Sequence, residues 1–385
     1  MPDEDFTVTP YAVEGDVDYD KVLEQFGADE LTDEDRNRFP EPLHPLIRRG
    51  IFYGGRDVDE WLDGVESDET VSIVTGRGPS GKMHLGHAFP FYLAKYLQEQ
   101  TGAHVYIPIS DDEKYFAKDQ SFEDIQGWAK NNIRELMAVG FDPEKTRFIV
   151  DTADADVVYP HAAKFAKKYT QSTVDATYGN PDNIGLSFYP AVQATHLLLP
   201  QLVHGKHQTL VPIAVDQDPH IRLCRDVAAK EQFDVTKPSA ILSRFFPQLK
   251  GDGGKMSSSG NDPTIYLDDD RETVEDKIKT YAYSGGQTSL DEHREKGGDP
   301  DVDVSYQLMY YFFEEDDEVV ERLAEEYRSG ELLSGEMKLK AAEKVADFLE
   351  AHQERKEALG EFEAELEKYT FTEEERATLT SDLLY

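Results

Sequence analysis

Residues 75–87 read TGRGPSGKMHLGH, and two patterns that bind nucleotides overlap in this short stretch. From Gly76 it reads G-x-x-x-x-G-K, which is typical of a loop that wraps phosphate groups. From His84 it reads H-x-G-H and opens a helix, where unpaired backbone N–H groups and the helix dipole attract an anion. The two patterns require different backbone geometries, so only one of them can bind a nucleotide here.

The phosphate-loop pattern is incomplete. Met83 follows Lys82 at the position where a Ser or Thr hydroxyl would bind magnesium, and Pro79 lacks a backbone N–H. H-x-G-H alone is a weak signal, because two histidines near a helix start can cap it or pack in a core, and a zinc pair lacks an evident third ligand. Gly86 nevertheless lets a base or ribose approach the backbone closely.

A second motif decides between the two patterns. Residues 251–260 read GDGGKMSSSG, and they place Lys255 and three serines in a glycine-rich loop. A lysine with small hydroxyls on a flexible loop suits a triphosphate that is later released as pyrophosphate, whereas the plain alternative is a polar linker. H-x-G-H followed by K-M-S-x-S, in this order and at this separation, favours nucleotide chemistry over coincidence.

The pattern around these motifs predicts an α/β fold with a Rossmann-like parallel sheet. Apolar, β-branched runs predict strands at 71–75, 105–109, 148–150 and 210–215. Helical spacing predicts helices from 85 to the stop at Gly102, from the cap at Ser121 to about Val139, and over 221–229. Alternating strands and helices imply right-handed crossovers, and ligands then bind beyond the carboxyl ends of the strands.

Four segments are predicted along the chain. Residues 1–70 form an acidic extension of short helices and a turn, broken by prolines and by Gly54-Gly55, and residues 71–266 form the Rossmann-like catalytic domain. Residues 267–369 form a helical domain with a long helix over 335–369, and residues 370–385 form a terminal helix opened by the capping box at Thr372 to Glu375.

Acidic residues dominate the composition. The 385 residues include 78 Asp and Glu against 40 Lys and Arg, a formal net charge of −38. The acidic runs occur along the whole chain, which favours a salt-adapted cytosol over an ordinary acidic protein, because molar salt screens the repulsion. We find no signal peptide or membrane-spanning run, so we expect a cytosolic protein. Cys224, the only cysteine, excludes an intramolecular disulfide and is interpreted as a core residue.

The two motifs resemble the signatures of class I aminoacyl-tRNA synthetases. Longer blocks resemble the archaeal and eukaryotic tryptophanyl-tRNA synthetases: TGRGPS with MHLGH, DDEKY at 111–115, FYPAVQA at 188–194, AVDQDPHIRLCRD from 214, and DEHREKGGDPDVDVS from 291. The resemblance runs from about Tyr19 to the C-terminal region. It implies that the helical domain binds the tRNA anticodon, that the enzyme is a homodimer, and that ATP, Mg²⁺, tryptophan and tRNA(Trp) are its ligands.

The implied reaction joins the carboxylate of an amino acid to the α-phosphate of ATP. The nucleophile is already ionised at pH 7, so catalysis needs positioning and charge stabilisation rather than a general base. Magnesium would be held mainly by the phosphates, with no protein metal site. The resemblance assigns the phosphates to Arg77, His84, His87, Lys255, Ser257 and Ser259, further ATP contacts to Gly76, Gly86, Asp216 and Met256, and the amino acid to Glu113, Gln193 and Gln217.

Three positions depart from the family pattern. Where the family has a Tyr and a Gln that would bind the indole N–H, this chain has Val74 and Pro108, and where the family has an anticodon-binding Arg it has Gln287. The chain is therefore a tryptophanyl-tRNA synthetase that uses another group, such as Tyr106 or a water, or a paralogue for another amino acid or acceptor, or a tRNA-binding regulatory protein. The intact His84, His87 and Lys255 argue against the third, and we favour the first because most of the matched blocks are otherwise kept.

Two further points concern partners. A nucleotidylyltransferase also uses H-x-G-H, but it would not need the helical region after residue 266. An acidic protein that binds tRNA needs a local cluster of cations. We expect a narrow basic strip, formed by Arg48, Arg49, Lys277, Lys279, Lys338 and Lys340.

Overall fold

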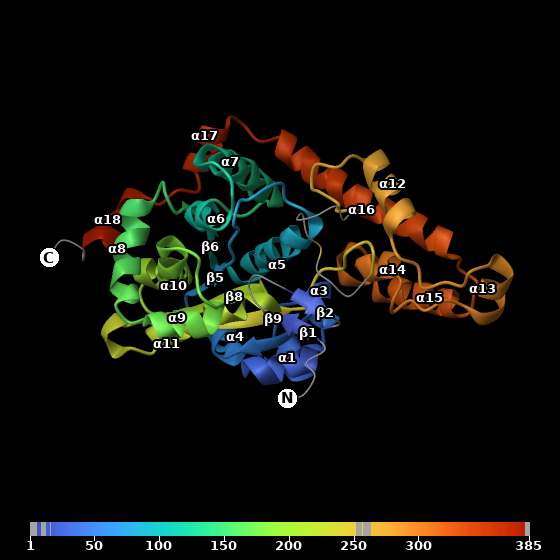
Figure 1. The fold of residues 1–385 in the computed structure, drawn as a ribbon, viewed down its shortest axis with the longest axis horizontal. Coiled ribbons are helices and arrows are strands. Elements are labelled where there is room, and N and C mark those ends of the chain that lie inside the picture. Colours follow the sequence, from blue (N-terminus) through green and yellow to red (C-terminus); the bar gives the residue numbers. More distant parts are fainter. Residues whose placement is uncertain (1–5, 9–12, 16, 252–255, 257–262, 382–385) are drawn as a thin grey trace.

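A seven-stranded sheet forms the centre of the computed structural model, which describes residues 6–8, 13–15, 17–251, 256 and 263–381 (Figure 1). The strand order is β3-β4-β9-β8-β5-β6-β7. The strands are β3 (Asp29–Glu30), β4 (Phe52–Arg56), β5 (Val71–Val74), β6 (His104–Ile109), β7 (Thr146–Val150), β8 (Gln208–Ala214) and β9 (Ser239–Ser243). A separate antiparallel pair is formed by β1 (Phe6–Val8) and β2 (Val13–Gly15).

Five of the seven strands are parallel, which confirms the Rossmann-like prediction. Counted along the chain from β5, their order across the sheet is 3-2-1-4-5. The chain starts in the middle with β5, winds outward through β6 and β7, and returns to place β8 on the other side of β5. The strand order reverses between β5 and β8, so their carboxyl ends form the crevice where such sheets bind ligands.

Helices cover both faces of this sheet, because alternate side chains of each strand point to opposite faces. On β6, Val105 and Ile107 pack in one core with α5 and α7, while Tyr106 packs in the other core with α8 and α10. The helices around the sheet are α1 (Tyr19–Phe26), α2 (Asp33–Asn37), α3 (Pro45–Arg48), α4 (Val58–Glu66), α5 (Leu85–Thr101), α6 (Asp111–Ala117), α7 (Phe122–Val139), α8 (Ala155–Ala166), α9 (Gln171–Tyr178), α10 (Ile184–His204) and α11 (Asp218–Ala228).

The helix boundaries follow the caps that the sequence contains. Ser121 accepts a hydrogen bond from the backbone N–H of Asp124 at the start of α7. Gly102 ends α5 with a φ of 68°, a left-handed conformation that glycine adopts without strain. No helix in the described part of the chain combines the length and the apolar character that a bilayer crossing would require.

Strand β4 corrects the prediction for residues 1–70. Gly54 and Gly55, interpreted as a break, lie within β4, which pairs antiparallel with β9, so the sheet is mixed. The glycines are required by close packing: a Cβ on Gly54 would lie 2.4 Å from Leu23 Cδ2, and one on Gly55 would lie 2.9 Å from the Ala240 carbonyl oxygen. A strand without apolar alternation carries no periodic signal, which explains why the sequence did not indicate it.

The chain from residue 267 onward is helical, as predicted. It contains α12 (Arg271–Tyr281), α13 (Leu290–Lys296), α14 (Val304–Leu308), α15 (Asp317–Arg328), α16 (Ser334–Glu357), α17 (Phe362–Glu367) and α18 (Glu373–Ser381). Figure 1 shows α12 to α15 with part of α16 as an extension beside the sheet, and α13 and α15 at its far end.

The predicted helix over 335–369 is wrong in one respect, because it is two helices. Helix α16 ends at Glu357, and α17 begins at Phe362. The chain then returns to the sheet, where the Tyr369 carbonyl accepts a 3.0 Å hydrogen bond from the Phe148 N–H. The capping box at Thr372 and Glu375 is present, and α18 packs on α8 and α10. Helical periodicity continues across the break, so only the tertiary contacts place it.

The charge surplus leads to a prediction about salt. We expect the melting temperature to fall by at least about 10 °C when KCl is lowered from about 2 M to 0.1 M, because the Debye length grows from under 3 Å to about 10 Å and uncovers the repulsion of the −38 net charge. Circular dichroism melts would measure it, with NaCl at equal ionic strength as the control. Equal melting temperatures at both KCl concentrations would contradict it.

Candidate active site

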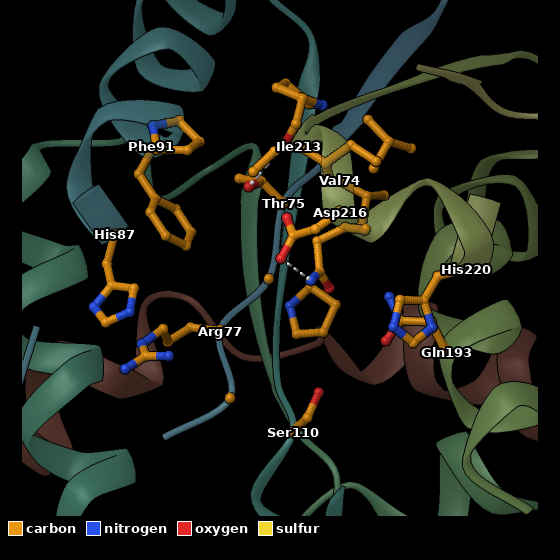
Figure 2. Close-up of a pocket in the computed structure, with 18 of the residues that line it drawn as sticks. Val74, Thr75, Arg77, His87, Phe91, Ser110, Gln193, Ile213, Asp216 and His220 are labelled. Carbon is orange, nitrogen blue, oxygen red and sulfur yellow. Dashed lines mark hydrogen bonds between the residues drawn. The ribbon is translucent and has the colours of Figure 1, made fainter. Parts of the chain in front are cut away.

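A cavity of about 450 Å³ opens at the carboxyl ends of β5 and β8, where the strand order reverses. It is lined by the ends of these strands and by residues from α5, β6, α10 and the β8–α11 connection. Figure 2 shows His87 and Arg77 together on one side, Gln193 and His220 on the other, and Asp216 between them. The site thus has two ends with different side chains.

The H-x-G-H motif forms the start of α5 and faces this cavity. His84 is the extended N-cap residue, and its backbone N–H donates to His87 Nδ1 at 3.3 Å. The two imidazole rings stack with their centroids 3.4 Å apart, and both line the cavity. A Cβ on Gly86 would lie 3.2 Å from two atoms of the His84 ring, so glycine is needed for this arrangement.

The structure brings the second motif to the same place. Lys255, Ser257 and Ser259 lie outside the described residues, but Met256 is described and lines the cavity. Its backbone N–H donates to the Phe246 carbonyl at 3.2 Å, and a Cβ on Gly86 would lie 3.4 Å from the Met256 Cβ. Segments about 170 residues apart therefore meet at one end of the cavity.

Arg77 contributes a cation to this end of the cavity. Its Nε donates to Asn132 Oδ1 at 3.1 Å, while its buried Nη2 has no hydrogen-bond partner among the described residues. Burial lowers the pKa of Arg77 to about 10, and the nearby Glu113 opposes that shift. A guanidinium that is charged at neutral pH with one arm unpaired is suited to an anionic ligand such as phosphate.

The structure contradicts the phosphate-loop interpretation of residues 76–82. Lys82, which would have to reach the phosphates, is exposed and pairs with Asp268 at 2.6 Å. It also lies over the Tyr266 ring, and it does not line the cavity. The nucleotide pattern that faces the cavity is H-x-G-H.

The residues assigned to the amino acid also line the cavity: Val74, Pro108, Glu113, Gln193 and Gln217, together with Gly76 and Asp216 from the ATP assignment. Glu113 is nearly buried and pairs with Lys114 Nζ at 2.7 Å. Buried Asp216 accepts a 3.2 Å hydrogen bond from Gln217 Nε2. The cavity thus holds carboxylate, amide and cationic groups around an apolar wall.

Several cavity residues were not assigned a role from the sequence: Ser110, Lys114, Tyr189, His196 and His220. The spacing on α10 was the available signal, because Tyr189, Gln193 and His196 are four and three residues apart and share a helix face. The prediction that Tyr106 could serve as a substitute partner for an indole is wrong. Its hydroxyl bonds to His204 Nε2 at 3.0 Å, and Tyr106 does not line the cavity.

A buried acidic cluster lies behind the cavity. The carboxylates of Asp111, Asp112 and Asp151 offer oxygen atoms that all lie within 4.8 Å of one another. Tyr159 and Thr152 donate hydroxyl hydrogen bonds to Asp112 and Asp111, and His196 Nε2 lies 2.6 Å from Asp151 Oδ1. The cluster does not line the cavity and contacts it through His196.

The residues proposed for tRNA are distributed differently from the prediction. Gln287 is exposed between α12 and α13, and its side chain donates to the Gly297 carbonyl at 2.9 Å. Arg48 and Arg49 both pair with Asp317 and bind backbone carbonyls, and only 4% of the Arg49 side chain is exposed. Lys277 pairs with Asp269 at 2.6 Å. These three cations hold the fold together, so they do not form the predicted exposed strip.

Comparison with known proteins agrees with this geometry. The family described as tRNA synthetases class I (W and Y) matches residues 66–350. The chain is 56% identical to tryptophan–tRNA ligase 2 of Halobacterium salinarum, over 96% of this chain and 95% of that protein. It is 46% identical to tryptophan–tRNA ligase of Saccharolobus solfataricus, over 93% of each. The solved tryptophanyl-tRNA synthetase of Giardia lamblia aligns with a TM-score of 0.85 and 32% identity, over 92% of this chain and 96% of that one.

Proposed function

The chain belongs to the class I aminoacyl-tRNA synthetases of the W and Y group, and from this premise we propose that it activates tryptophan with ATP and transfers it to tRNA(Trp). The observation that carries the proposal is the meeting of H-x-G-H, Met256 and Arg77 in one cavity with the amino-acid residues. Relatives named tryptophan–tRNA ligase match almost the whole chain, which supports the substrate.

The chemistry proceeds in two steps. An oxygen of the tryptophan carboxylate attacks the α-phosphorus of ATP, the bond from that phosphorus to the bridging oxygen breaks, and pyrophosphate leaves. A hydroxyl of the terminal tRNA ribose then attacks the carbonyl of the adenylate and AMP leaves. Arg77, His84 and His87 at the α5 end are placed to stabilise the charge that develops on the phosphates.

The donor set fits ATP and magnesium. The unpaired Nη2 of Arg77 and the close backbone approach at Gly86 suit a polyphosphate and a nucleoside. Magnesium would be held mainly by the phosphates and water, so it needs no dedicated protein site, and Glu113 and Asp216 keep their roles toward the amino acid and ATP. When bound, magnesium would neutralise charge on the phosphates. A homodimer, which the resemblance implies, and a cytosolic location, which was expected from the sequence, remain proposals.

The substitutions at Val74 and Pro108 support a second candidate, a paralogue that activates a different amino acid. ATP–pyrophosphate exchange in molar KCl, run with each of the standard amino acids in turn, separates the candidates. We expect exchange with tryptophan alone, and Lys255→Ala provides the blank because it removes the loop lysine. Exchange with another amino acid would establish the paralogue. Exchange with none would indicate a tRNA-binding protein that no longer aminoacylates.

A further inference from the structure

The amino-acid end of the cavity lacks an obvious acceptor for the indole N–H. Neither Val74 nor Pro108 carries a side chain that can accept a hydrogen bond, and Tyr106 is engaged elsewhere. A donor that is buried without a partner is strongly disfavoured, and a site with a matched acceptor discriminates by the same margin against analogues that lack the donor. A synthetase for tryptophan therefore needs another acceptor in this wall.

On the premise that tryptophan is the substrate, we propose that His196 is the specificity-determining residue that accepts the indole N–H at its Nδ1 atom. His196 lies on α10, three residues after Gln193 and on the same helix face. Its ring lines the cavity, and none of its side chain is exposed to bulk solvent. The neighbouring cavity residues Val74, Pro108 and Leu197 are apolar, which suits an indole ring.

The hydrogen bond on the other side of the ring determines which nitrogen can accept. His196 Nε2 lies 2.6 Å from Asp151 Oδ1, and a carboxylate can only accept, so Nε2 carries the hydrogen. The neutral ring then has its lone pair on Nδ1, which has no hydrogen-bond partner among the described residues. Burial lowers the pKa of His196 to about 4, so the ring is neutral near pH 7.

The acidic cluster maintains this tautomer. Burial raises the pKa of Asp151, and burial with the neighbouring Asp151 charge raises the pKa of Asp112 to about 8. Oxygen atoms of the Asp112 and Asp151 carboxylates lie within 4.8 Å of each other, so a proton held by Asp112 leaves Asp151 ionised and its Oδ1 able to accept from His196. Asp112 and Asp151 are thus positioning residues behind the cavity.

The other polar groups of this wall are less suited to the role. His220 Nδ1 lies 2.7 Å from the Tyr178 hydroxyl, so this nitrogen already has a hydrogen-bond partner. The Tyr189 hydroxyl lies 2.9 Å from Ser110 Oγ and 2.6 Å from Gln193 Oε1, so these three groups are hydrogen-bonded to one another. His196 Nδ1, by contrast, is a buried nitrogen that has no hydrogen-bond partner among the described residues.

The test compares tryptophan with β-(3-benzothienyl)alanine, in which a sulfur replaces the indole N–H in a ring of nearly the same shape. In ATP–pyrophosphate exchange, we expect the wild-type protein to prefer tryptophan in kcat/KM by about 10- to 100-fold. His196→Leu should reduce this ratio to within about 3-fold of unity, because it removes the acceptor and keeps the apolar wall. If His196 had a merely structural role, the variant would have a lower kcat/KM for both substrates by the same factor, and the ratio would be preserved.

Two further variants keep the test decisive. His196→Asn places an amide oxygen near the position of Nδ1 and should retain part of the ratio, so it serves if His196→Leu does not fold. His220→Phe alters the other cavity histidine and should leave the ratio unchanged, whatever it does to the rate. A wild-type ratio near unity, or a full ratio in His196→Leu, would overturn the inference. Wild-type exchange with an amino acid other than tryptophan would instead overturn the proposed function.

Discussion

Replacing Arg77 with alanine is expected to lower kcat/KM in tryptophan-dependent pyrophosphate exchange by about 10²- to 10³-fold, the usual loss when one charge-stabilising donor is removed. The reason is its placement: Nη2 is buried at the α5 end of the cavity and has no hydrogen-bond partner among the described residues, so we expect it to donate to the ligand. The same feature predicts little change in the free energy of unfolding, because the variant loses mainly the single 3.1 Å bond to Asn132.

Lys82→Ala provides the matched control for this experiment. Lys82 is a cation five residues along the same segment, but it pairs with Asp268 outside the cavity. We expect exchange by Lys82→Ala within about 2-fold of the wild type, since an exposed ion pair contributes little. If Lys82→Ala lost more activity than Arg77→Ala, the phosphate-loop interpretation would be restored and the assignment of H-x-G-H would fail.

Replacing Glu135 with alanine is expected to lower the free energy of unfolding by about 3 kcal/mol, as removal of one partner from a buried ionic network does. Glu135 on α7 accepts from His352 Nε2 at 2.9 Å and pairs with Lys356, both on α16. The Tyr92 hydroxyl lies 2.8 Å from His352 Nδ1 and extends the network to α5. The side chains of Glu135 and His352 are 4% and 0% exposed, so water cannot replace the lost partner.

Urea unfolding in molar KCl would measure this change, and Glu99→Ala is the matched control. Glu99 forms a 2.5 Å pair with Lys95, but its side chain is 54% exposed, so we expect a loss below about 0.5 kcal/mol. Equal losses in the two variants would show that the network between α7 and α16 contributes no more than a surface pair. Because α16 also packs against α12, a large loss for Glu135→Ala would mean that this network fastens the helical region to the sheet.

The sequence was sufficient where a local pattern carries the signal. The β-branched runs of β5, β6 and β8 and the caps at Ser121 and Gly102 indicated their elements to within a few residues. Strands β4 and β9 were missed: β4 contains two glycines, and β9 reads SAILS, in which Ile241 is the single β-branched residue. The break between α16 and α17 was missed because helical periodicity continues through it.

The active-site residues show the same division. Motif residues such as His84, Gly86 and Asp216 were recognised from their order in the chain, and the structure places them around one cavity. Arg48 and Arg49 were expected on an exposed basic strip, but both pair with Asp317, more than 260 residues away, because a cation in a sequence does not show which carboxylate it will meet. Tyr106 was misjudged because its hydroxyl bonds to His204 Nε2, on a residue 98 positions away in the sequence.

The sequence by itself determined the fold class, the nucleotide chemistry and the family, because these depend on motifs whose residues are adjacent in the chain. Only the tertiary structure decided which groups lack a partner among the described residues: the Nη2 of Arg77 and the Nδ1 of His196 are both buried there without a hydrogen bond. Hydrogen-bond satisfaction depends on every neighbour at once, including residues far away in the sequence, so no local pattern can reveal it.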